Sequence, residues 1–295
     1  MMPEYSIITF PSFGISWNAP VGFQVGPLEI RLYALLIVLG LALAVIYACR
    51  RSKQFGLKDD DILDGVLFIV PFAIICTRLY YCIFSWENYK DNWLDIFKIW
   101  EGGLAIYGGV IGAAIGILIF ALVKKDKVNL FAVLDITALG FLIGQAIGRW
   151  GNFFNREAFG AETDSFFRMG LTDAYGRVKY YHPTFLYESV WNLCGFVLLH
   201  FLSKKRKYDG QIALGYVAWY GLGRAFIEGL RTDSLYWGRF RVSQVLAAAS
   251  CVIAVGLLIF FQIRKPDPEK LFVRRVAARE AAAEENEEQE EQENE

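Results

Sequence analysis

The chain alternates between long apolar runs and short polar connections. A helix needs roughly 20 mostly apolar residues to cross the hydrocarbon core of a membrane, and the pattern predicts seven such spans. The fourth is interrupted by Asp135 and Gln145. The predicted spans are Ile30–Cys49, Ile62–Phe84, Gly103–Val123, Leu130–Gly148, Thr184–Leu202, Gln211–Gly229 and Ser243–Ile263. The sequence therefore predicts an all-α polytopic membrane protein of about seven transmembrane helices.

Basic residues are concentrated in one set of connections. Arg50–Lys58, Lys124–Asn129 and Ser203–Gly210 are rich in Lys and Arg, and so is the segment after the last span. With seven spans these segments share one face, which the positive-inside rule makes cytoplasmic. The N-terminus is then outside and the C-terminus cytoplasmic. The outer-face connection between helices 4 and 5, Arg149–Pro183, is long enough that we expect it to carry function.

Composition agrees with this interpretation. The 295 residues are 55% hydrophobic and 16% aromatic, which excludes a disordered chain and disfavours a soluble enzyme. We divide the chain into an extracytoplasmic segment 1–29, a seven-helix transmembrane catalytic domain 30–263 and a cytoplasmic tail 264–295. The tail is basic and then acidic, and its last residues include no large apolar side chain, so it is predicted to be largely disordered.

The cysteines and histidines disfavour a metal site. The five cysteines lie in or beside apolar runs without a CxxC pair, and only His182 and His200 provide imidazoles. We therefore expect neither a disulfide framework nor a bound metal.

Two arginines are placed next to apolar runs, where charge is costly unless it finds a partner, a wet cavity or a ligand. Arg149 follows the fourth predicted span, and Arg224 lies inside the sixth. The planar guanidinium can bind phosphate through two hydrogen bonds, so the pair suggests a site that binds an anionic lipid. The alternative is a structural ion pair with an intramembrane carboxylate, for which the candidates are Asp135, Glu157 and Glu228.

The third predicted span carries a glycine face. Gly108, Gly112 and Gly116 are four residues apart, which is typical of close helix packing. Gly108 also adjoins Tyr107 near the outer end of the span, where a glycine equally lets a ligand approach the backbone.

Several separated motifs together resemble the bacterial phosphatidylglycerol–prolipoprotein diacylglyceryl transferase family. The resemblance extends from about Leu28 to Ile263 and covers every predicted span. The matching segments are Gly148-Arg-Trp-Gly-Asn-Phe-Phe-Asn-Arg-Glu157 through Gly160, His182-Pro-Thr-Phe-Leu-Tyr-Glu188, Gly223-Arg-Ala-Phe-Ile-Glu228 with Arg231, Glu101-Gly-Gly-Leu-Ala-Ile-Tyr-Gly-Gly109, Leu134-Asp-Ile136, and Arg78.

The resemblance implies an enzyme of the bacterial inner membrane whose active site faces the extracytoplasmic side. It would transfer the diacylglyceryl group of phosphatidylglycerol to the lipobox cysteine of a prolipoprotein signal peptide, with glycerol phosphate as the by-product. This is the first step of lipoprotein maturation. The family needs no metal or organic cofactor, and the expected partners are these two substrates and the lipid bilayer, with no nucleic acid. The family often has a His where this chain has Tyr107, so that His cannot be the base here.

The resemblance and the residue chemistry together give the candidate site. Tyr107 is expected to donate a hydrogen bond to the leaving phosphate, because an unperturbed phenol with a pKa near 10 is a poor base. Glu228 either holds Arg224 in place or acts directly, and Glu157 either accepts the thiol proton or steadies Arg149. The predicted catalytic residues are Arg149, Arg224, Tyr107, Glu157 and Glu228, and the predicted substrate-binding residues are Arg149, Asn152, Asn155, Tyr33, Tyr220, Gly108 and Gly160.

Some of these residues have an equally simple structural interpretation. Asn152 and Asn155 could cap the end of a helix, and His182 could be a loop-to-helix residue. Tyr33, with Tyr80 and Tyr81, could belong to an interfacial aromatic belt.

Three other functional classes share some of these features. A lipid or anion transporter or scramblase would also use intramembrane arginines, but the two arginine motifs do not resemble each other as inverted repeats would. A non-catalytic scaffold would tolerate loss of Arg149 and Arg224. An intramembrane hydrolase lacks a Ser/His or paired-Asp arrangement in the spans.

Overall fold

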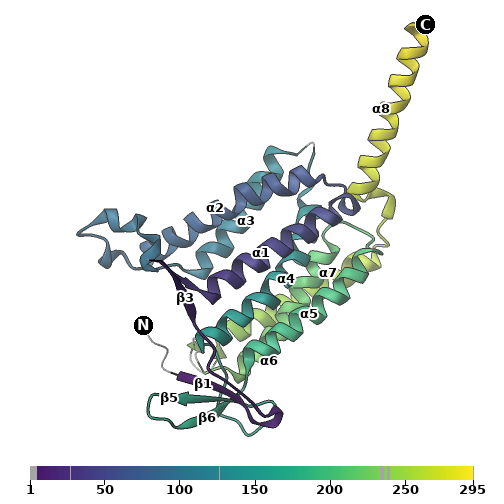
Figure 1. The fold of residues 1–295 in the computed structure, drawn as a ribbon. Coiled ribbons are helices and arrows are strands. Elements are labelled where there is room, and N and C mark those ends of the chain that lie inside the picture. Colours follow the sequence, from purple (N-terminus) through teal and green to yellow (C-terminus); the bar gives the residue numbers. More distant parts are fainter. Residues whose placement is uncertain (1–4, 27, 126, 233–235, 238–239, 295) are drawn as a thin grey trace. The chain divides into compact units, whose positions relative to one another are not determined.

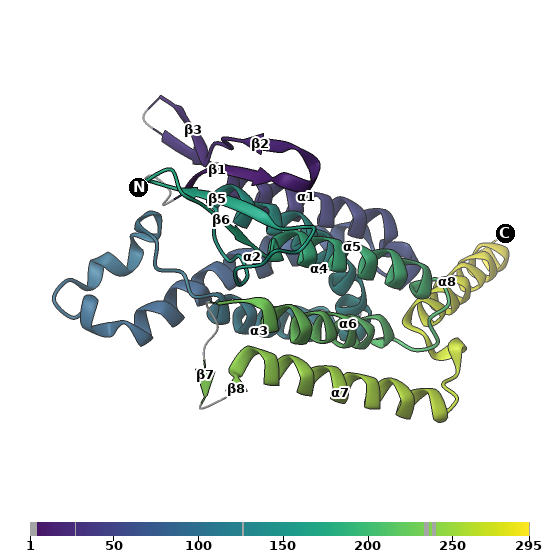
Figure 2. The same ribbon diagram turned by 90° about the horizontal axis from the view of Figure 1, so that it is seen from below.

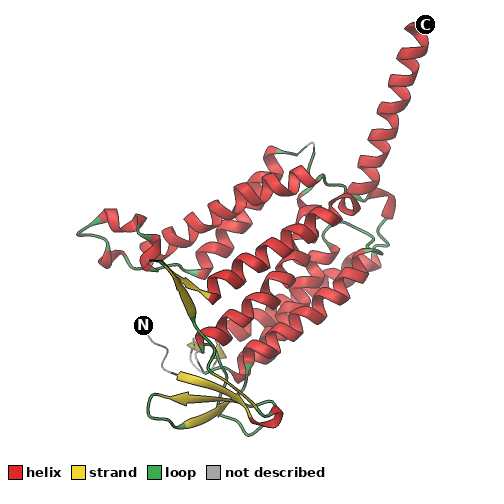
Figure 3. Ribbon diagram, viewed as in Figure 1, coloured by secondary structure: helices red, strands yellow, loops and turns green. Residues whose placement is uncertain are grey.

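The computed structural model is mostly helical (Figure 1, Figure 3). It describes residues 5–26, 28–125, 127–232, 236–237 and 240–294. The chain forms two compact units. Unit 1 comprises Met1–Tyr47 and Thr137–Pro268, and unit 2 comprises Ala48–Ile136 and Glu269–Glu295.

Long apolar helices dominate both units. The α-helices are α1 Leu32–Arg51, α2 Asp59–Phe84, α3 Ile106–Val123, α4 Leu130–Asn155, α5 Thr184–Ser203, α6 Gln211–Ile227, α7 Val242–Ile263 and α8 Phe272–Asn294. Within the described residues, six helices are long and apolar enough to cross a membrane, namely α1 to α5 and α7. This confirms a polytopic helical membrane protein. The remaining predicted span is α6, which has 17 residues, so the count of seven stays a prediction.

The sequence predicts an all-α protein, and the structure adds short strands before α1, between α4 and α5, and before α7. They are β1 Tyr5–Phe10, β2 Ile15–Trp17, β3 Gly22–Val25, β4 Leu28–Arg31, β5 Met169–Asp173, β6 Val178–Tyr181, β7 Tyr236–Trp237 and β8 Phe240–Arg241. An antiparallel sheet in the order β2-β1-β5-β6 joins the N-terminal segment to the connection between α4 and α5 (Figure 2). The pairs β3-β4 and β7-β8 are separate hairpins.

The sheet is anchored to the helices by an apolar cluster in unit 1. Ile8 on β1 lies opposite Leu171 on β5, and both are at most 1% exposed. They pack with Phe153 near the end of α4 and Phe185 at the start of α5, whose rings are 5.0 Å apart. Burial of each such side chain contributes about 1.5–3 kcal/mol. The cluster therefore holds the last turn of α4 and the first turn of α5 together.

In unit 2, α2 and α3 pack through the glycine face that the spacing predicts. A Cβ added at Gly108 or Gly112 would lie 2.5 Å from backbone or side-chain atoms of Cys76 on α2, and one at Gly116 would lie 3.3 Å from Phe72. Glycine is needed at these positions because the helices approach closely.

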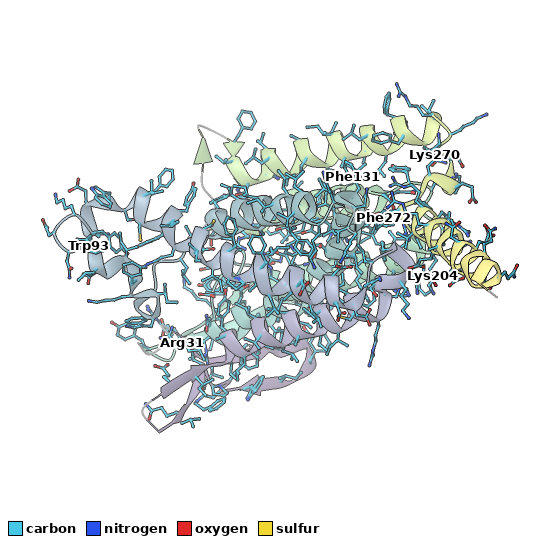
Figure 4. The ribbon with its side chains drawn as sticks, turned by 90° about the horizontal axis from the view of Figure 1, so that it is seen from above. Arg31, Trp93, Phe131, Lys204, Lys270 and Phe272 are labelled. Carbon is cyan, nitrogen blue, oxygen red and sulfur yellow. The ribbon has the colours of Figure 1, made fainter. Side chains whose placement is uncertain are left out.

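An arm of short helical turns, residues 85–104, connects α2 to α3 and includes η3 Trp86–Asn88, η4 Trp93–Phe97 and η5 Ile99–Glu101. Figure 4 labels Trp93 on this arm. Arg78 on α2 is only 6% exposed and donates five hydrogen bonds, of 2.6 to 3.2 Å, to arm carbonyls between Asp95 and Gly103. Its guanidinium also lies 5.3 Å from the Tyr89 ring centroid. Arg78 therefore clamps the arm.

The C-terminal tail differs from its prediction. The sequence predicts a largely disordered tail, whereas the structure describes residues 272–294 as the helix α8. Ala, Glu and Gln are strong helix formers even without an apolar face to bury. The start of the helix is fixed within unit 2, because Leu271 and Phe272 are buried and a Cβ added at Gly56 would lie 2.8 Å from the backbone of Val273. Phe272 is labelled in Figure 4.

Candidate active site

A charged cluster in unit 1 brings together three arginines and two glutamates, which we call the arginine cluster. Glu188 on α5 is its centre: Oε2 lies 2.5 Å from Nη2 of Arg149, and Oε1 lies 3.0 Å from Nη1 of Arg224 and 3.7 Å from Nη1 of Arg231. Nη2 of Arg224 lies 2.6 Å from Oε2 of Glu228 in η6 Glu228–Leu230. Residues from three separate segments thus meet in one cluster: α4, α5, and the stretch from α6 through Arg231.

The cluster is buried but not sealed. The side chains of Glu188 and Glu228 are 6% and 2% exposed, whereas those of Arg149 and Arg224 are 24% and 19% exposed. Three guanidinium groups against two carboxylates leave a net charge of +1. The carboxylates are therefore covered, while the guanidinium groups remain accessible to an anion.

The partner of Arg149 is not one of the carboxylates proposed from the sequence. Its described ion pair is with Glu188, whereas Glu157 contacts the two neighbouring asparagines. Glu228 forms an ion pair with Arg224, which is the contact that a supporting role would use.

Helix α4 continues for two turns beyond its predicted end, and this carries Arg149 into the cluster. The extension is tied to α5 by hydrogen bonds: Nε1 of Trp150 donates to Oγ of Ser189 at 3.2 Å, and Oγ of Ser189 donates to the Ala146 carbonyl at 2.7 Å. Ser189 directly follows Glu188 in sequence, so these bonds also position the central carboxylate.

Helices α5 and α6 are joined by a reciprocal tryptophan pair. Nε1 of Trp191 donates to the Trp219 carbonyl at 3.0 Å, and Nε1 of Trp219 donates to the Trp191 carbonyl at 2.9 Å. The two rings stack at 4.4 Å, each against a glycine of the opposite helix, Gly223 or Gly195. This pair fixes the α5–α6 spacing and thereby the Glu188–Arg224 contact.

A polar chain extends from Arg149 toward the surface. Nη1 of Arg149 donates to Oδ1 of Asn152 at 3.2 Å, and the side-chain amides of Asn152 and Asn155 both donate to Oε1 of Glu157, at 3.0 and 3.1 Å. Glu157 is exposed. Oδ1 of Asn155 is buried without a hydrogen-bond partner, so it can accept from a bound ligand. In the described contacts, Glu157 reaches Arg149 through Asn152.

Just after α4, two non-glycine residues, Arg156 and Ala158, adopt left-handed backbone conformations. Arg156 has φ of 54° in the left-handed region, is 5% exposed, and donates to the carbonyls of Phe154 (2.9 Å) and Ala19. Burial lowers the pKa of its guanidinium. These bonds link the segment before β3 to the end of α4.

Two predicted binding residues lie beside the cluster, and a third is enclosed by backbone. Tyr33 on α1 packs on Gly151 of α4, where an added Cβ would lie 2.5 Å from its ring. Tyr220 lines a small pocket with Arg224 on α6. At Gly160 an added Cβ would lie 2.7 Å from His182 and 2.8 Å from the Leu230 carbonyl, so its smallness serves backbone packing.

The remaining predicted residues do not join the cluster as described. Tyr107 is 53% exposed at the start of α3, and Gly108 packs on α2. Both belong to unit 2, so their part in a common site stays a prediction. His182, before α5, has Nδ1 3.4 Å from the Tyr187 hydroxyl, and burial lowers its pKa.

Sequence reasoning missed Glu188 and Arg231 as site residues, although both occur in the quoted motifs. Glu188 lies inside the fifth predicted span, so the cost of an intramembrane charge already marked it. Arg231 follows η6, and no feature of its own segment indicates that it turns back toward Glu188.

The chain is similar in sequence to a known enzyme family and to several of its members. A sequence model described as "Prolipoprotein diacylglyceryl transferase" matches residues 20–260. The chain is 42% identical over 262 residues to a protein of Listeria monocytogenes serotype 4a, covering 86% of this chain and 94% of that protein. It is 43% identical to one of Bacillus velezensis, with 83% and 93% covered, and 46% identical to one of Streptococcus suis, with 81% and 90% covered. Each relative is named phosphatidylglycerol–prolipoprotein diacylglyceryl transferase.

Proposed function

The chain belongs to the prolipoprotein diacylglyceryl transferase family, and we propose that its arginine cluster holds the phosphate of phosphatidylglycerol during transfer. The enzyme moves the diacylglyceryl group from phosphatidylglycerol to a prolipoprotein, which is the first step of lipoprotein maturation. The acceptor in this proposal is the lipobox cysteine of the signal peptide.

The bonds exchanged define what the site must do. The cysteine sulfur attacks the diacylglyceryl CH2 that bears the phosphate, so a C–S bond forms and the C–O bond breaks. The electron pair of that bond stays on the phosphate oxygen, and glycerol phosphate leaves. The thiol proton passes to a base, because the thiolate is the effective nucleophile and a free thiol has a pKa of about 8.5.

The observation that carries this proposal is the surplus of accessible guanidinium in a cluster whose carboxylates are covered. The leaving phosphate gains negative charge as the C–O bond breaks, and donors held in place beforehand stabilise that charge most where water is scarce. Glu188 contacts Arg149, Arg224 and Arg231 at once. Its role is to orient these arginines, and that of Glu228 is to hold Arg224.

The polar chain supplies the remaining functions. Glu157 is the proposed base, because it is exposed and its Oε1 is fixed by Asn152 and Asn155. The two asparagines, with Tyr33 and Tyr220, would contact the glycerol and ester groups of the lipid. Tyr107 would donate a hydrogen bond to the leaving phosphate. No metal or organic cofactor takes part.

The proposal also includes the membrane arrangement. Seven spans, with α6 as the shortest, put the basic connections on the cytoplasmic face of the bacterial inner membrane. The N-terminal strands and the connection between α4 and α5 then lie on the extracytoplasmic face, and the active site opens toward it. The prolipoprotein signal peptide would reach the site from that side.

The test is a transfer reaction with purified protein. Detergent-solubilised enzyme is mixed with phosphatidylglycerol and a lipobox peptide, and mass spectrometry follows a diacylglyceryl thioether on the cysteine. Wild type should form the thioether and glycerol phosphate, while Arg149→Ala and Arg224→Ala should form neither. Arg177→Ala, which removes an exposed arginine paired with Asp173, is the matched control and should retain activity. Full transfer by both cluster variants would refute the phosphate-binding role.

A further inference from the structure

A small pocket lies beside the arginine cluster, between α5 and α6. It is lined by residues of these two helices and the turn of α6 that leads into η6: Glu188, Trp191, Asn192, Tyr220, Gly223, Arg224 and Ile227. Asn192 follows Glu188 by four residues on α5, which places it one turn, about 6 Å, further along the helix. The proposed transfer mechanism gives this polar lining residue no role.

Asn192 is buried without a partner. Its side chain is 2% exposed, and among the described residues no hydrogen bond to its amide is found. The other buried polar residues of α5 near it are satisfied: Ser189 donates to the Ala146 carbonyl at 2.7 Å, and Thr184 donates to the Ala158 carbonyl at 2.5 Å. A buried amide left unpaired costs about 1–3 kcal/mol. The amide at Asn192 is thus left available to a molecule that enters the pocket.

The pocket cannot close around this amide without breaking other contacts. Trp191, the residue before Asn192, is held by the reciprocal bonds to Trp219 and by its stacked ring. Gly223 on the facing helix has no room for a side chain, because an added Cβ would lie 2.1 Å from Nε1 of Trp191. The unpaired side-chain amide of Asn192 therefore lies in a rigid part of the pocket lining.

The position of Asn192 along α5, relative to the arginine cluster, corresponds to that of the uncharged ester groups relative to the phosphate in a phospholipid. In a bound phosphatidylglycerol the phosphate lies at the polar end, and the two acyl ester groups lie toward the hydrocarbon interior. The arginine cluster includes Glu188, the fifth residue of α5, whereas Asn192 lies one turn closer to the middle of that helix. An ester carbonyl offers only acceptors, and a primary amide offers two N–H donors.

We propose that Asn192 donates a hydrogen bond to an ester carbonyl of the diacylglyceryl group, making it a residue that selects ester-linked lipid. This rests on the proposed function, in which the arginine cluster holds the phosphate of the same lipid. Two groups of the same lipid would then be recognised in order along α5: the anionic phosphate by the arginines around Glu188, and one neutral carbonyl oxygen by Asn192.

The test compares diester phosphatidylglycerol with a diether analogue, which has the same headgroup but no ester carbonyls. Wild-type enzyme should use the diester about tenfold better in kcat/KM, the effect expected for one hydrogen bond in a buried site. Asn192→Leu, which keeps the side-chain volume and removes the donor, should lose about tenfold on the diester and almost nothing on the diether. Its thermal unfolding midpoint should equal or exceed that of wild type, because no hydrogen bond is lost in the free enzyme.

The control is Ser203→Ala, which removes a buried hydroxyl that donates to the His200 carbonyl at 2.7 Å near the far end of the same helix. It should leave the diester preference unchanged. Equal losses of Asn192→Leu on both lipids, or a preference that survives the substitution, would overturn the ester assignment while leaving the transferase function intact. Absence of transfer from either lipid by wild type would instead overturn the proposed function and the inference that rests on it.

Discussion

Substitution of Glu188 by Gln tests whether the arginine cluster is held by one central carboxylate. The change keeps the side-chain shape and removes its charge. Glu188 contacts Arg149 at 2.5 Å, Arg224 at 3.0 Å and Arg231 at 3.7 Å. In Glu188→Gln, three guanidinium groups would face only Glu228, so the charge of the cluster would rise from +1 to +2.

The size of the effect follows from these contacts. Two of them are charge-assisted hydrogen bonds, each contributing about 1.5–3 kcal/mol, and the glutamine oxygen can replace one in part. Breaking a buried ion pair by removing one partner costs about 3–5 kcal/mol. Because Arg149 is 24% exposed and gains some solvation, we expect the lower end, about 3 kcal/mol. At about 2–4 °C per kcal/mol, the unfolding midpoint should fall by about 6–12 °C.

The assay is thermal unfolding of purified protein in one detergent at one ionic strength. Glu162→Gln is the matched control, since Glu162 pairs with Lys179 at 2.7 Å but both side chains are about 60% exposed; its midpoint should stay within about 1 °C of wild type. A midpoint for Glu188→Gln that is equal to that of this control would refute the idea that Glu188 holds the arginines.

Three further predictions concern other parts of the fold. Gly223→Ala places a methyl group against the Trp191 ring and should destabilise the protein by about 1–3 kcal/mol with loss of transfer, whereas Gly229→Ala, whose added Cβ would lie 3.6 Å from its nearest neighbour, should not. Arg78→Lys cannot reproduce five hydrogen bonds from one planar group, so limited trypsin digestion should cut the arm faster than in wild type. Burial lowers the pKa of His182, so the unfolded chain binds this proton more readily; stability present above about pH 6.5 should be lost as the pH falls, and the fall in unfolding midpoint between pH 7 and 5 should be smaller in His182→Asn.

The helices were predictable from the sequence because the hydrophobic run alone determines where a membrane span forms. The third predicted span, Gly103–Val123, corresponds to α3 Ile106–Val123. Helix α4, however, runs on to Asn155, past the predicted end at Gly148. Hydropathy indicates an end where charges begin, but here Arg149 and Asn152 find partners that make the helical extension stable.

The sheet was not predictable by the same reasoning. Strand β1 pairs with β5 across more than 150 residues, and Ile8 lies opposite Leu171. Each strand is short, and only the pairing between distant segments produces a buried face. The tail was predicted to be disordered but forms a helix for a local reason. Ala- and Glu-rich sequence has a high helix propensity even where there is no apolar face to bury.

The candidate site was predictable as a set of costly charges, but the partners of those charges were not. Arg149, Arg224 and Glu228 were chosen because charge beside apolar sequence needs an explanation. Of the carboxylates named from the sequence as ion-pair partners, Glu228 pairs with Arg224, whereas Arg149 pairs with Glu188, which the sequence analysis did not name. Which faces of α4, α5 and α6 meet depends on packing such as the Trp191–Trp219 pair, which single-helix patterns do not encode.

The most direct test of the central claim, that the arginine cluster binds the leaving phosphate, is product inhibition by glycerol phosphate. The inhibition constant is measured for wild type, for Arg149→Lys and Arg224→Lys, and for Arg177→Lys as an exposed control. Lysine keeps the charge but cannot form a two-bond contact, so both cluster variants should bind glycerol phosphate about tenfold or more weakly, and the control should not change. Inhibition constants equal to wild type in both cluster variants, together with slower transfer, would contradict the claim and reduce the arginines to a structural role.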